Sequence, residues 1–173
     1  MLRKFDLKDF DKIYEIMELS FPRDEYRPYE GQKALLDDEA YQIYVLSDEQ
    51  SLEIKGLIAI WEYESLVFVE HLAVAPQYRN GGIGSLILKE TEELLGKMLC
   101  LEVELPETEL ASRRIDFYKR NGYYLNKYPY MQPALAEGQE PVPLLIMTTH
   151  KELTAEEFEN IKELLYTKVY KII

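Results

Sequence analysis

Apolar residues recur at helical spacing in some segments and at strand-like spacing in others, and the pattern predicts both kinds of element in the first half of the chain. Helical spacing indicates helices at residues 10–19, with Asp9 as the N-cap, and at 30–36. Strand-like runs follow, and short polar turns join them into an antiparallel meander. The expected strands are 2–5, 41–47, 52–63 and 66–74.

The second half continues the alternation of helices and strands. Asn121-Gly122 should end one helix, and Thr154 with Glu157 forms a capping box that starts another. Four prolines and one glycine indicate a loop at 129–143. The expected helices are 82–98, 109–120 and 154–171, and the expected strands are 100–105, 123–128 and 144–149.

Two of these helices have apolar faces that should point inward. The first face comprises Ile83, Leu86, Ile87, Leu94, Leu95 and Met98. The second comprises Phe158, Ile161, Leu165 and Ile172. The element order predicts one α/β (α+β) domain over residues 1–173, with a mixed sheet and helices on both of its faces.

Composition narrows the functional classes. The net charge of −12 argues against a nucleic-acid binder and suits a cationic partner, although acidity also serves solubility alone. We expect no membrane span and no signal peptide. The single Cys100 cannot form an internal disulfide, which indicates a cytoplasmic protein. His71 and His150 are far apart in sequence, so we expect no metal site.

The segment VAPQYRNGGIGSLIL, residues 74–88, joins a predicted strand to a predicted helix. A helix start leaves backbone N–H groups without partners, and glycines let an anion approach them. Arg79 could add a charged contact. The segment lacks the Gly-Lys-Ser/Thr of a P-loop and the third glycine of a dinucleotide fingerprint. It is either a phosphate cradle or a glycine-rich turn.

These residues resemble a motif of the GNAT family of N-acetyltransferases, [QR]-x-x-G-x-[GA], matched by Arg79, Gly82 and Gly84. A second segment, residues 115–123, resembles the family's FYxxxGF segment, with Tyr123 in place of the last Phe. The strand order also matches. The resemblance implies the GNAT fold, with a mostly antiparallel sheet, over nearly the whole chain.

The resemblance implies acetyl-CoA as co-substrate. The pyrophosphate would be bound by N–H groups of Arg79, Asn80, Gly81, Gly82, Ile83, Gly84 and Ser85. In the family the preceding strand, here Leu72, Ala73 and Val74, carries a bulge and splays from the next strand, and one of its N–H groups stabilises the oxyanion. Ala111 stands where the family often has Asn, so one expected CoA contact is absent.

Tyr118 occupies the family's tyrosine position and is the candidate acid, with packing beside Phe117 as the alternative. Glu70 is the candidate for ordering the amine or relaying its proton, with a salt bridge as the alternative. By period-two alternation Glu70 should share a face with Phe68, Leu72 and Val74, while His71 points the other way as a structural residue. Family members often carry the glutamate at the position of Phe68.

Glu102 and Glu104 should share one face of a strand beside the expected cleft. They could bind an ammonium or a diamine, or pair with Arg113 and Arg114. The aromatic segment 123–133 could line the acceptor pocket through cation–π contacts, or be an ordinary strand and loop.

The sequence therefore predicts an N-acetyltransferase that moves acetyl from acetyl-CoA to a primary amine of a small cationic molecule or peptide by direct attack. One alternative is a non-catalytic acyl-CoA sensor. Another is an interaction module whose acidic helix, residues 154–171, forms a partner surface, for example in a homodimer.

Overall fold

The computed structural model describes residues 1–172. The chain forms two compact units, one over Met1–Lys97 and one from Met98 onward, and each is described by itself. Within the described residues, no helix combines the length and the apolar character needed to span a bilayer. The predicted order of elements is confirmed in both units.

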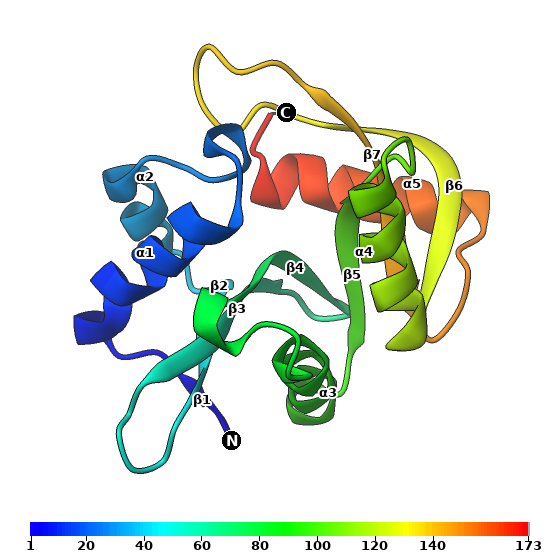
Figure 1. Cartoon of the computed structure of the whole chain (residues 1–173). Helices are drawn as coiled ribbons and strands as arrows, with labels where there is room; N and C mark the ends of the chain where they lie inside the picture. The colour runs from blue at the N-terminus through cyan, green and yellow to red at the C-terminus, as the bar shows by residue number, and fades with distance from the viewer. Residues whose placement is uncertain (173) are drawn as a thin grey trace. The chain divides into compact units, whose positions relative to one another are not determined.

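The first unit contains four strands in the order β1-β2-β3-β4, and every neighbouring pair is antiparallel (Figure 1). This is the predicted meander with a short first strand at its edge. The strands are β1 (Leu2–Lys4), β2 (Tyr41–Ser47), β3 (Ile54–Glu62) and β4 (Leu66–Val74). The helices are α1 (Phe10–Ser20), α2 (Tyr29–Ala34) and α3 (Ile83–Leu95).

Helices cover both faces of these strands. A Cβ atom added at Gly56 in β3 would lie 2.8 Å from Cδ1 of Ile87, so this face of β3 packs closely against α3. Ala59 points to the opposite face because side chains alternate along a strand. Its partner in β4 is His71, whose ring contacts Phe21 directly after α1. The core of the unit therefore has two layers, one on each side of the strands.

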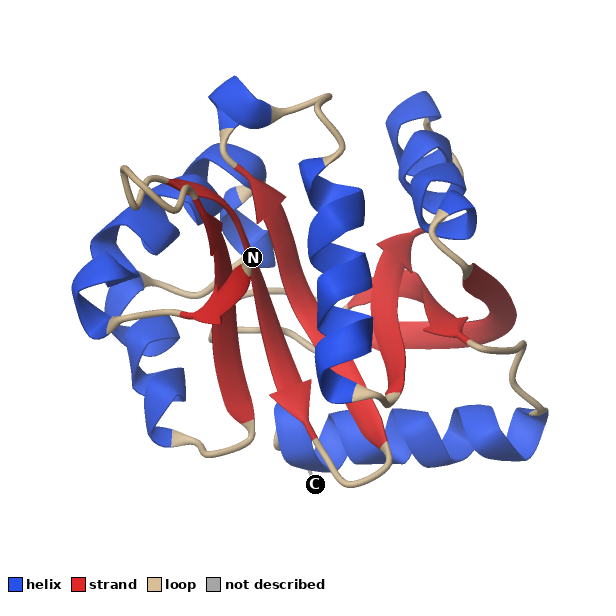
Figure 2. Ribbon diagram, turned by 90° about the horizontal axis from the view of Figure 1, so that it is seen from below, coloured by secondary structure: helices blue, strands red, loops and turns tan. Residues whose placement is uncertain are grey.

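The second unit contains three antiparallel strands in the order β5-β7-β6. Helix α4 lies on one face of these strands and α5 on the other (Figures 1 and 2). The strands are β5 (Met98–Glu104), β6 (Tyr123–Gln132) and β7 (Val142–Thr149). The helices are α4 (Glu109–Arg120) and α5 (Ala155–Leu164), which continues as a π-helical turn over Leu165–Val169.

The start of α1 differs from the prediction. Asp9 makes no side-chain hydrogen bond as a cap, because a 3₁₀ turn over Leu7–Asp9 precedes the helix. Asp6 caps that turn, and the Asp9 carboxylate accepts the Asp6 N–H and a hydrogen bond from Arg3. Asp9 thus closes a capping box one turn earlier than expected.

The predicted apolar face of α3 is only partly correct. Leu86 and Leu94 are 40% and 57% exposed, whereas Ile87, Leu88 and Thr91 are buried. The buried face is therefore rotated around the helix axis relative to the predicted one, and it includes the small polar residue Thr91. The helix ends at Gly96, which has a left-handed φ of 61°, so Met98 lies in β5 instead.

The end of the chain also corrects the prediction. Strand β6 extends through Pro129 into the predicted loop, and its pairing with β7 shifts between Asn126 and Tyr130. A proline, which has no N–H to donate, is tolerated at such an irregularity. The capping box of Thr154 and Glu157 is confirmed. Ile172, expected inside, is 51% exposed because the helical turns end before it.

Candidate active site

The loop between β4 and α3 has two residues in the left-handed backbone region, Asn80 at φ 65° and Gly82 at φ 78°. Asparagine and glycine are the residues that adopt this conformation at least cost. Gly82 is the N-cap of α3 and has no side chain with which to cap it. The sequence pattern Asn-Gly-Gly-x-Gly therefore serves the backbone conformation at the helix start.

The first turn of α3 has backbone N–H groups that find no acceptor within the helix itself. The Leu86 N–H donates to the Gly82 carbonyl over 3.0 Å, which leaves the N–H groups of Ile83, Gly84 and Ser85 without an intrahelical acceptor. A Cβ atom added at Gly82 would meet no atom within 4 Å. Open donors at a positive helix end suit a phosphate group.

The Arg79 side chain does not extend the cradle in the way that the sequence suggests. Its Nε donates to the Val74 carbonyl over 3.1 Å. Its Nη2 donates to the Leu19 carbonyl and to Ser20 Oγ over 3.3 and 3.1 Å. The guanidinium therefore joins the end of β4 to the end of α1 and holds the loop by its first residue.

Strand β4 contains a bulge that changes the predicted orientation of Glu70. Ala59 pairs with His71, but the next residue of β3, Ile60, pairs with Val69, so Glu70 is an extra residue without a partner in β3. The predicted shared face is wrong for this reason. Phe68 lies on the face of Trp61, whereas Leu72 and Val74 lie on the face of Ile58 and Gly56.

The position of the bulge also differs from the expectation. Residues 71–74 pair with β3 without interruption, from His71 opposite Ala59 to Val74 opposite Gly56. The bulge on this side of β4 therefore lies at Glu70, before Leu72, Ala73 and Val74. An irregularity here gives the backbone next to Glu70 a conformation that a regular strand lacks.

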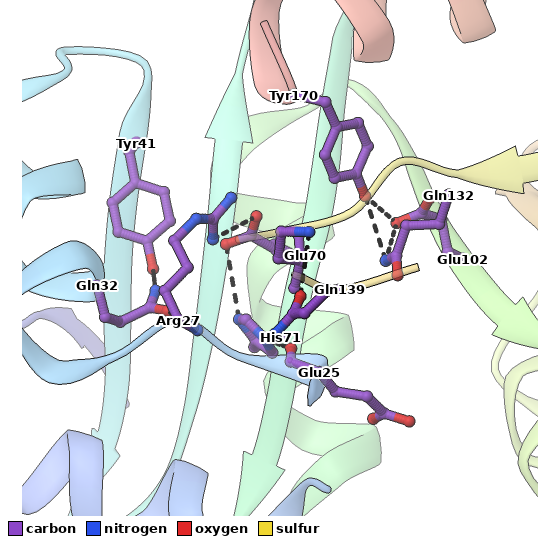
Figure 3. Close-up of polar contacts among 11 residues, drawn as sticks. Glu25, Arg27, Gln32, Tyr41, Glu70, His71, Glu102, Gln132, Gln139 and Tyr170 are labelled. Carbon is purple, nitrogen blue, oxygen red and sulfur yellow. Dashed lines mark hydrogen bonds and ion pairs between the residues drawn. The ribbon is translucent and has the colours of Figure 1, made fainter. Parts of the chain in front are cut away.

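Glu70 and His71 lie together in a buried polar cluster (Figure 3). Arg27 Nη1 donates to Glu70 Oε1 over 3.0 Å, and the two side chains are 12% and 5% exposed. The second carboxylate oxygen, Oε2, lies 3.6 Å from His71 Nδ1. The salt bridge considered from the sequence is present, and its cation is Arg27, which the sequence pattern did not single out.

His71 is hydrogen-bonded and buried, as expected for this residue. Its Nε2 lies 2.8 Å from the Glu25 carbonyl oxygen, so Nε2 carries a hydrogen and donates it. Burial lowers the pKa of the His71 imidazole, and the nearby Glu70 carboxylate partly opposes that change. The expectation that His71 points away from Glu70 is wrong, because the bulge turns both side chains into one cluster.

In the second unit, Tyr118 lies on α4 with its ring 5.2 Å from that of Phe117 and 5.5 Å from that of Tyr123. Burial raises the pKa of its hydroxyl to about 12, so the phenol stays protonated at neutral pH. A protonated hydroxyl can donate to a leaving anion. Ala111, at the position of the family's Asn, is buried in the first turn of the same helix.

Glu102 and Glu104 of β5 have different partners. Arg114 Nη1 lies 3.2 Å from Glu104 Oε1, in a half-exposed ion pair. Glu102 Oε1 accepts hydrogen bonds from the Tyr170 hydroxyl and from Gln132 Nε2, the latter over 3.2 Å (Figure 3). The predicted pairing with Arg114 is therefore confirmed for Glu104, while Arg113 pairs with Glu109.

Part of the aromatic segment serves packing. Tyr123 and Tyr130 are buried, and Tyr128 stacks on Phe158 with ring centroids 4.9 Å apart. Cys100 is buried too, and burial raises the pKa of its thiol well above the usual range. Among residues 1–172, no three His, Cys, Asp or Glu side chains are grouped as metal ligands.

Comparison with protein families gives one match. The family described as the acetyltransferase (GNAT) domain matches residues 39–125. That range contains the glycine loop, the bulged strand and the Tyr118 segment. The comparison with curated proteins returned no match.

Solved structures match most or all of the chain. A putative GNAT-family acetyltransferase from Bacteroides thetaiotaomicron is 32% identical, with a TM-score of 0.90 over 100% of this chain and 99% of that chain. The ribosomal-protein-S18-alanine N-acetyltransferase of Escherichia coli is 17% identical, with a TM-score of 0.65 over 90% and 96%. An aminoglycoside 6'-N-acetyltransferase complexed with coenzyme A is 18% identical, with a TM-score of 0.61 over 86% and 96%.

Proposed function

The chain belongs to the GNAT family of acetyltransferases, and on this premise we propose that it acetylates a primary amine with acetyl-CoA. The acceptor is a small cationic molecule or a peptide. The similar folds are those of enzymes named for ribosomal-protein alanine, spermidine and aminoglycoside N-acetylation, all of which are amine acceptors.

The observation that carries the proposal is the uncapped start of α3. Three consecutive N–H groups, those of Ile83, Gly84 and Ser85, lack intrahelical acceptors, and the N-cap Gly82 leaves the space in front of its Cα open. Such a site suits the pyrophosphate of coenzyme A better than an uncharged ligand. The Arg79 N–H donates to the Pro76 carbonyl, so it is not one of the predicted open donors. The Arg79 side chain fixes the loop through carbonyl oxygens, while the N–H groups of Ile83, Gly84 and Ser85 remain as donors.

The chain's own residues would then serve two tasks. Bound acetyl-CoA supplies an activated thioester carbonyl. A backbone N–H among Leu72, Ala73 and Val74 stabilises the developing oxyanion, and the protonated Tyr118 hydroxyl supports the leaving thiolate. Direct attack by the amine fits better than an acyl-cysteine intermediate, because the single cysteine is buried with a raised pKa.

The acidic groups indicate a cationic acceptor. Glu70 lies close to the proposed oxyanion segment on β4, and Glu102 and Glu104 lie two residues apart on β5. The net charge of −12 favours the approach of a positively charged amine. We propose that Glu102 orders the acceptor, and that the enzyme acts in the cytoplasm.

Acetyl-CoA binding to two isosteric variants tests the cofactor site. Gly82→Asn and Gly82→Asp place side chains of similar shape at the N-cap, and both tolerate a left-handed backbone. The Asp carboxylate repels a pyrophosphate, whereas the Asn amide does not. We expect isothermal titration to give a Kd at least about tenfold higher for Gly82→Asp than for Gly82→Asn.

The outcomes separate the alternatives. Equal acetyl-CoA affinity in the two folded variants, or no binding by the folded wild type, would contradict the proposed cofactor site. A panel of monoamines, diamines, aminoglycosides and peptides tests for acetyl transfer. If the protein binds acetyl-CoA but acetylates none of them, the interpretation as an acyl-CoA sensor replaces that as an enzyme. Circular dichroism of each variant verifies the fold.

A further inference from the structure

Two buried acceptor atoms face one another in the polar cluster of the first unit. Glu70 Oε2 lies 3.6 Å from His71 Nδ1, and the two side chains are 5% and 3% exposed. Neither atom has a hydrogen-bond donor within the described residues. Buried acceptors without donors cost free energy, so this arrangement needs a reason.

The hydrogen bonds around the pair define its protonation state. Because Nε2 of His71 donates to the Glu25 carbonyl, Nδ1 of the neutral ring carries only a lone pair. Arg27 binds Glu70 Oε1, which leaves Oε2 as the oxygen directed to the ring. One added proton on Nδ1 would convert two unpartnered acceptors into a charge-assisted hydrogen bond.

The charged and titratable neighbours come from several elements. Arg27, from the connection after α1, forms an ion pair with Glu70 and disfavours a charged His71 ring. Burial raises the pKa of the Tyr41 hydroxyl in β2 and of the Tyr63 hydroxyl after β3, and the Glu70 charge raises both further. Both hydroxyls therefore stay neutral. The His71 ring, with a lone pair on Nδ1 directed to Glu70 Oε2, is therefore the group in this cluster to which a proton can be added.

We propose that Glu70 and His71 act as one proton-accepting pair, in which His71 Nδ1 takes the proton and the Glu70 carboxylate stabilises the resulting imidazolium. The inference rests on the proposed function, since the proton is the one that the acceptor amine loses. It assigns a role to His71 beyond that of a structural residue.

The step balances as a simple proton transfer. An N–H bond of the ammonium breaks, its electron pair stays on nitrogen and becomes the nucleophile, and a new N–H bond forms at His71 Nδ1. Because both side chains are more than nine-tenths buried, the transfer requires water molecules between the amine and His71 Nδ1. The pair and Arg27 together change from net charge zero to plus one.

The protonation state can be measured without any substrate. The chain has two histidines, and ¹⁵N NMR of the imidazoles with His150→Gln as the assignment control identifies His71. We expect the Nε2–H form at high pH and protonation of Nδ1 on acidification, with a midpoint below the ordinary pKa of 6.5. In Glu70→Gln the midpoint should fall by about one pH unit or more, or below the accessible range, because the stabilising carboxylate is lost.

The kinetic test uses kcat at saturating amine, whose pH dependence reports groups in the bound complex. The acidic limb should follow the His71 midpoint and move to lower pH in Glu70→Gln. His71→Gln should abolish that limb and lower kcat by about 100-fold or more. His150→Gln, which changes an exposed histidine, should leave both unchanged.

A proton on Nδ1 at high pH, no protonation of His71 before unfolding, or an unchanged midpoint in Glu70→Gln would each overturn the inference. The two proposals fail in distinguishable ways. If the wild type acetylates no amine, the proposed function fails, and NMR still decides whether the pair accepts a proton. If the wild type is active but its acidic limb stays in place in Glu70→Gln, only the inference about the pair fails.

Discussion

At the scale of single residues, Glu70 separates what sequence reasoning can and cannot predict. A carboxylate within an apolar strand requires a partner, and that requirement can be stated from the sequence alone. The partner, Arg27, lies 43 residues away in the connection between α1 and α2, so no local pattern identifies it. The bulge that brings His71 beside Glu70 also cannot be predicted from period-two alternation, which assumes a regular strand.

The ion pair of Arg27 and Glu70 should be costly to break on one side. Arg27→Met keeps the apolar stem but leaves a buried carboxylate without its cation, and we expect a loss of about 3 kcal/mol in the free energy of unfolding. The double variant Arg27→Met/Glu70→Gln should recover about 2 kcal/mol of it, because no unpaired charge remains. Urea unfolding of the four proteins in this cycle measures both values.

Strictly additive losses would show that the two side chains do not interact in the folded protein. Lys12→Met serves as a control, because Lys12 forms an exposed i,i+3 pair with Glu15. An exposed pair contributes about 0–1 kcal/mol, so this variant should unfold close to the wild type.

At the scale of elements, local patterns were most informative where side-chain alternation and capping residues agree. The bounds of β2, β4 and α4 match the prediction to the residue. The predicted inward face of α3 is wrong in part, because Leu86 and Leu94 are exposed while Thr91 is buried. Helical spacing locates an apolar face only approximately, and the packing partner in β3 determines which residues are covered.

The contact between α3 and β3 depends on Gly56. In Gly56→Ala the new Cβ would lie 2.8 Å from Ile87 Cδ1 and 2.9 Å from the Ala73 carbonyl oxygen, so a helix or a strand must shift. We expect a loss of about 1–3 kcal/mol in the free energy of unfolding, measured by urea denaturation. Because α3 carries the glycine loop, acetyl-CoA affinity should fall as well.

Gly31→Ala provides the matched control for this prediction. Gly31 lies within α2, and the nearest atom to an added Cβ is Arg27 Cβ at an ordinary 3.6 Å. This variant should be as stable as the wild type or more stable by up to about 1 kcal/mol. Equal effects at the two glycines would mean that close packing is not what excludes a side chain from position 56.

At the scale of the whole molecule, the sequence predicts the order of the elements and the family. It does not identify the acceptor molecule. The motif residues determine the backbone conformation of the glycine loop, and a local sequence pattern of this kind can be recognised from the sequence alone. The acidic side chains Glu70 and Glu102 have partners, Arg27 and Tyr170, that are distant in sequence, so no local pattern identifies them. Overall charge gives only the sign of the expected ligand.

The net charge of −12 predicts a salt effect on acceptor binding. For a diamine, KM should rise several-fold between about 20 and 200 mM salt, because ions screen the attraction between an acidic protein and a doubly charged substrate. A monoamine of the same chain length should show a smaller rise. Steady-state assays of both amines at several salt concentrations measure the difference, and parallel changes would rule out a charge-based preference.

The bulge at Glu70 also bears on how such a site can change during evolution. A point substitution at residue 70 replaces the side chain but leaves the extra residue in β4. Only deletion of a codon removes it. Because Val69 already pairs with Ile60 beside the pair of Ala59 and His71, that deletion would leave Leu66, Val67, Phe68 and Val69 on their present faces and make β4 a regular strand. Substitution can therefore change the chemistry of this position, whereas the backbone geometry that presents it changes only when the length of β4 changes.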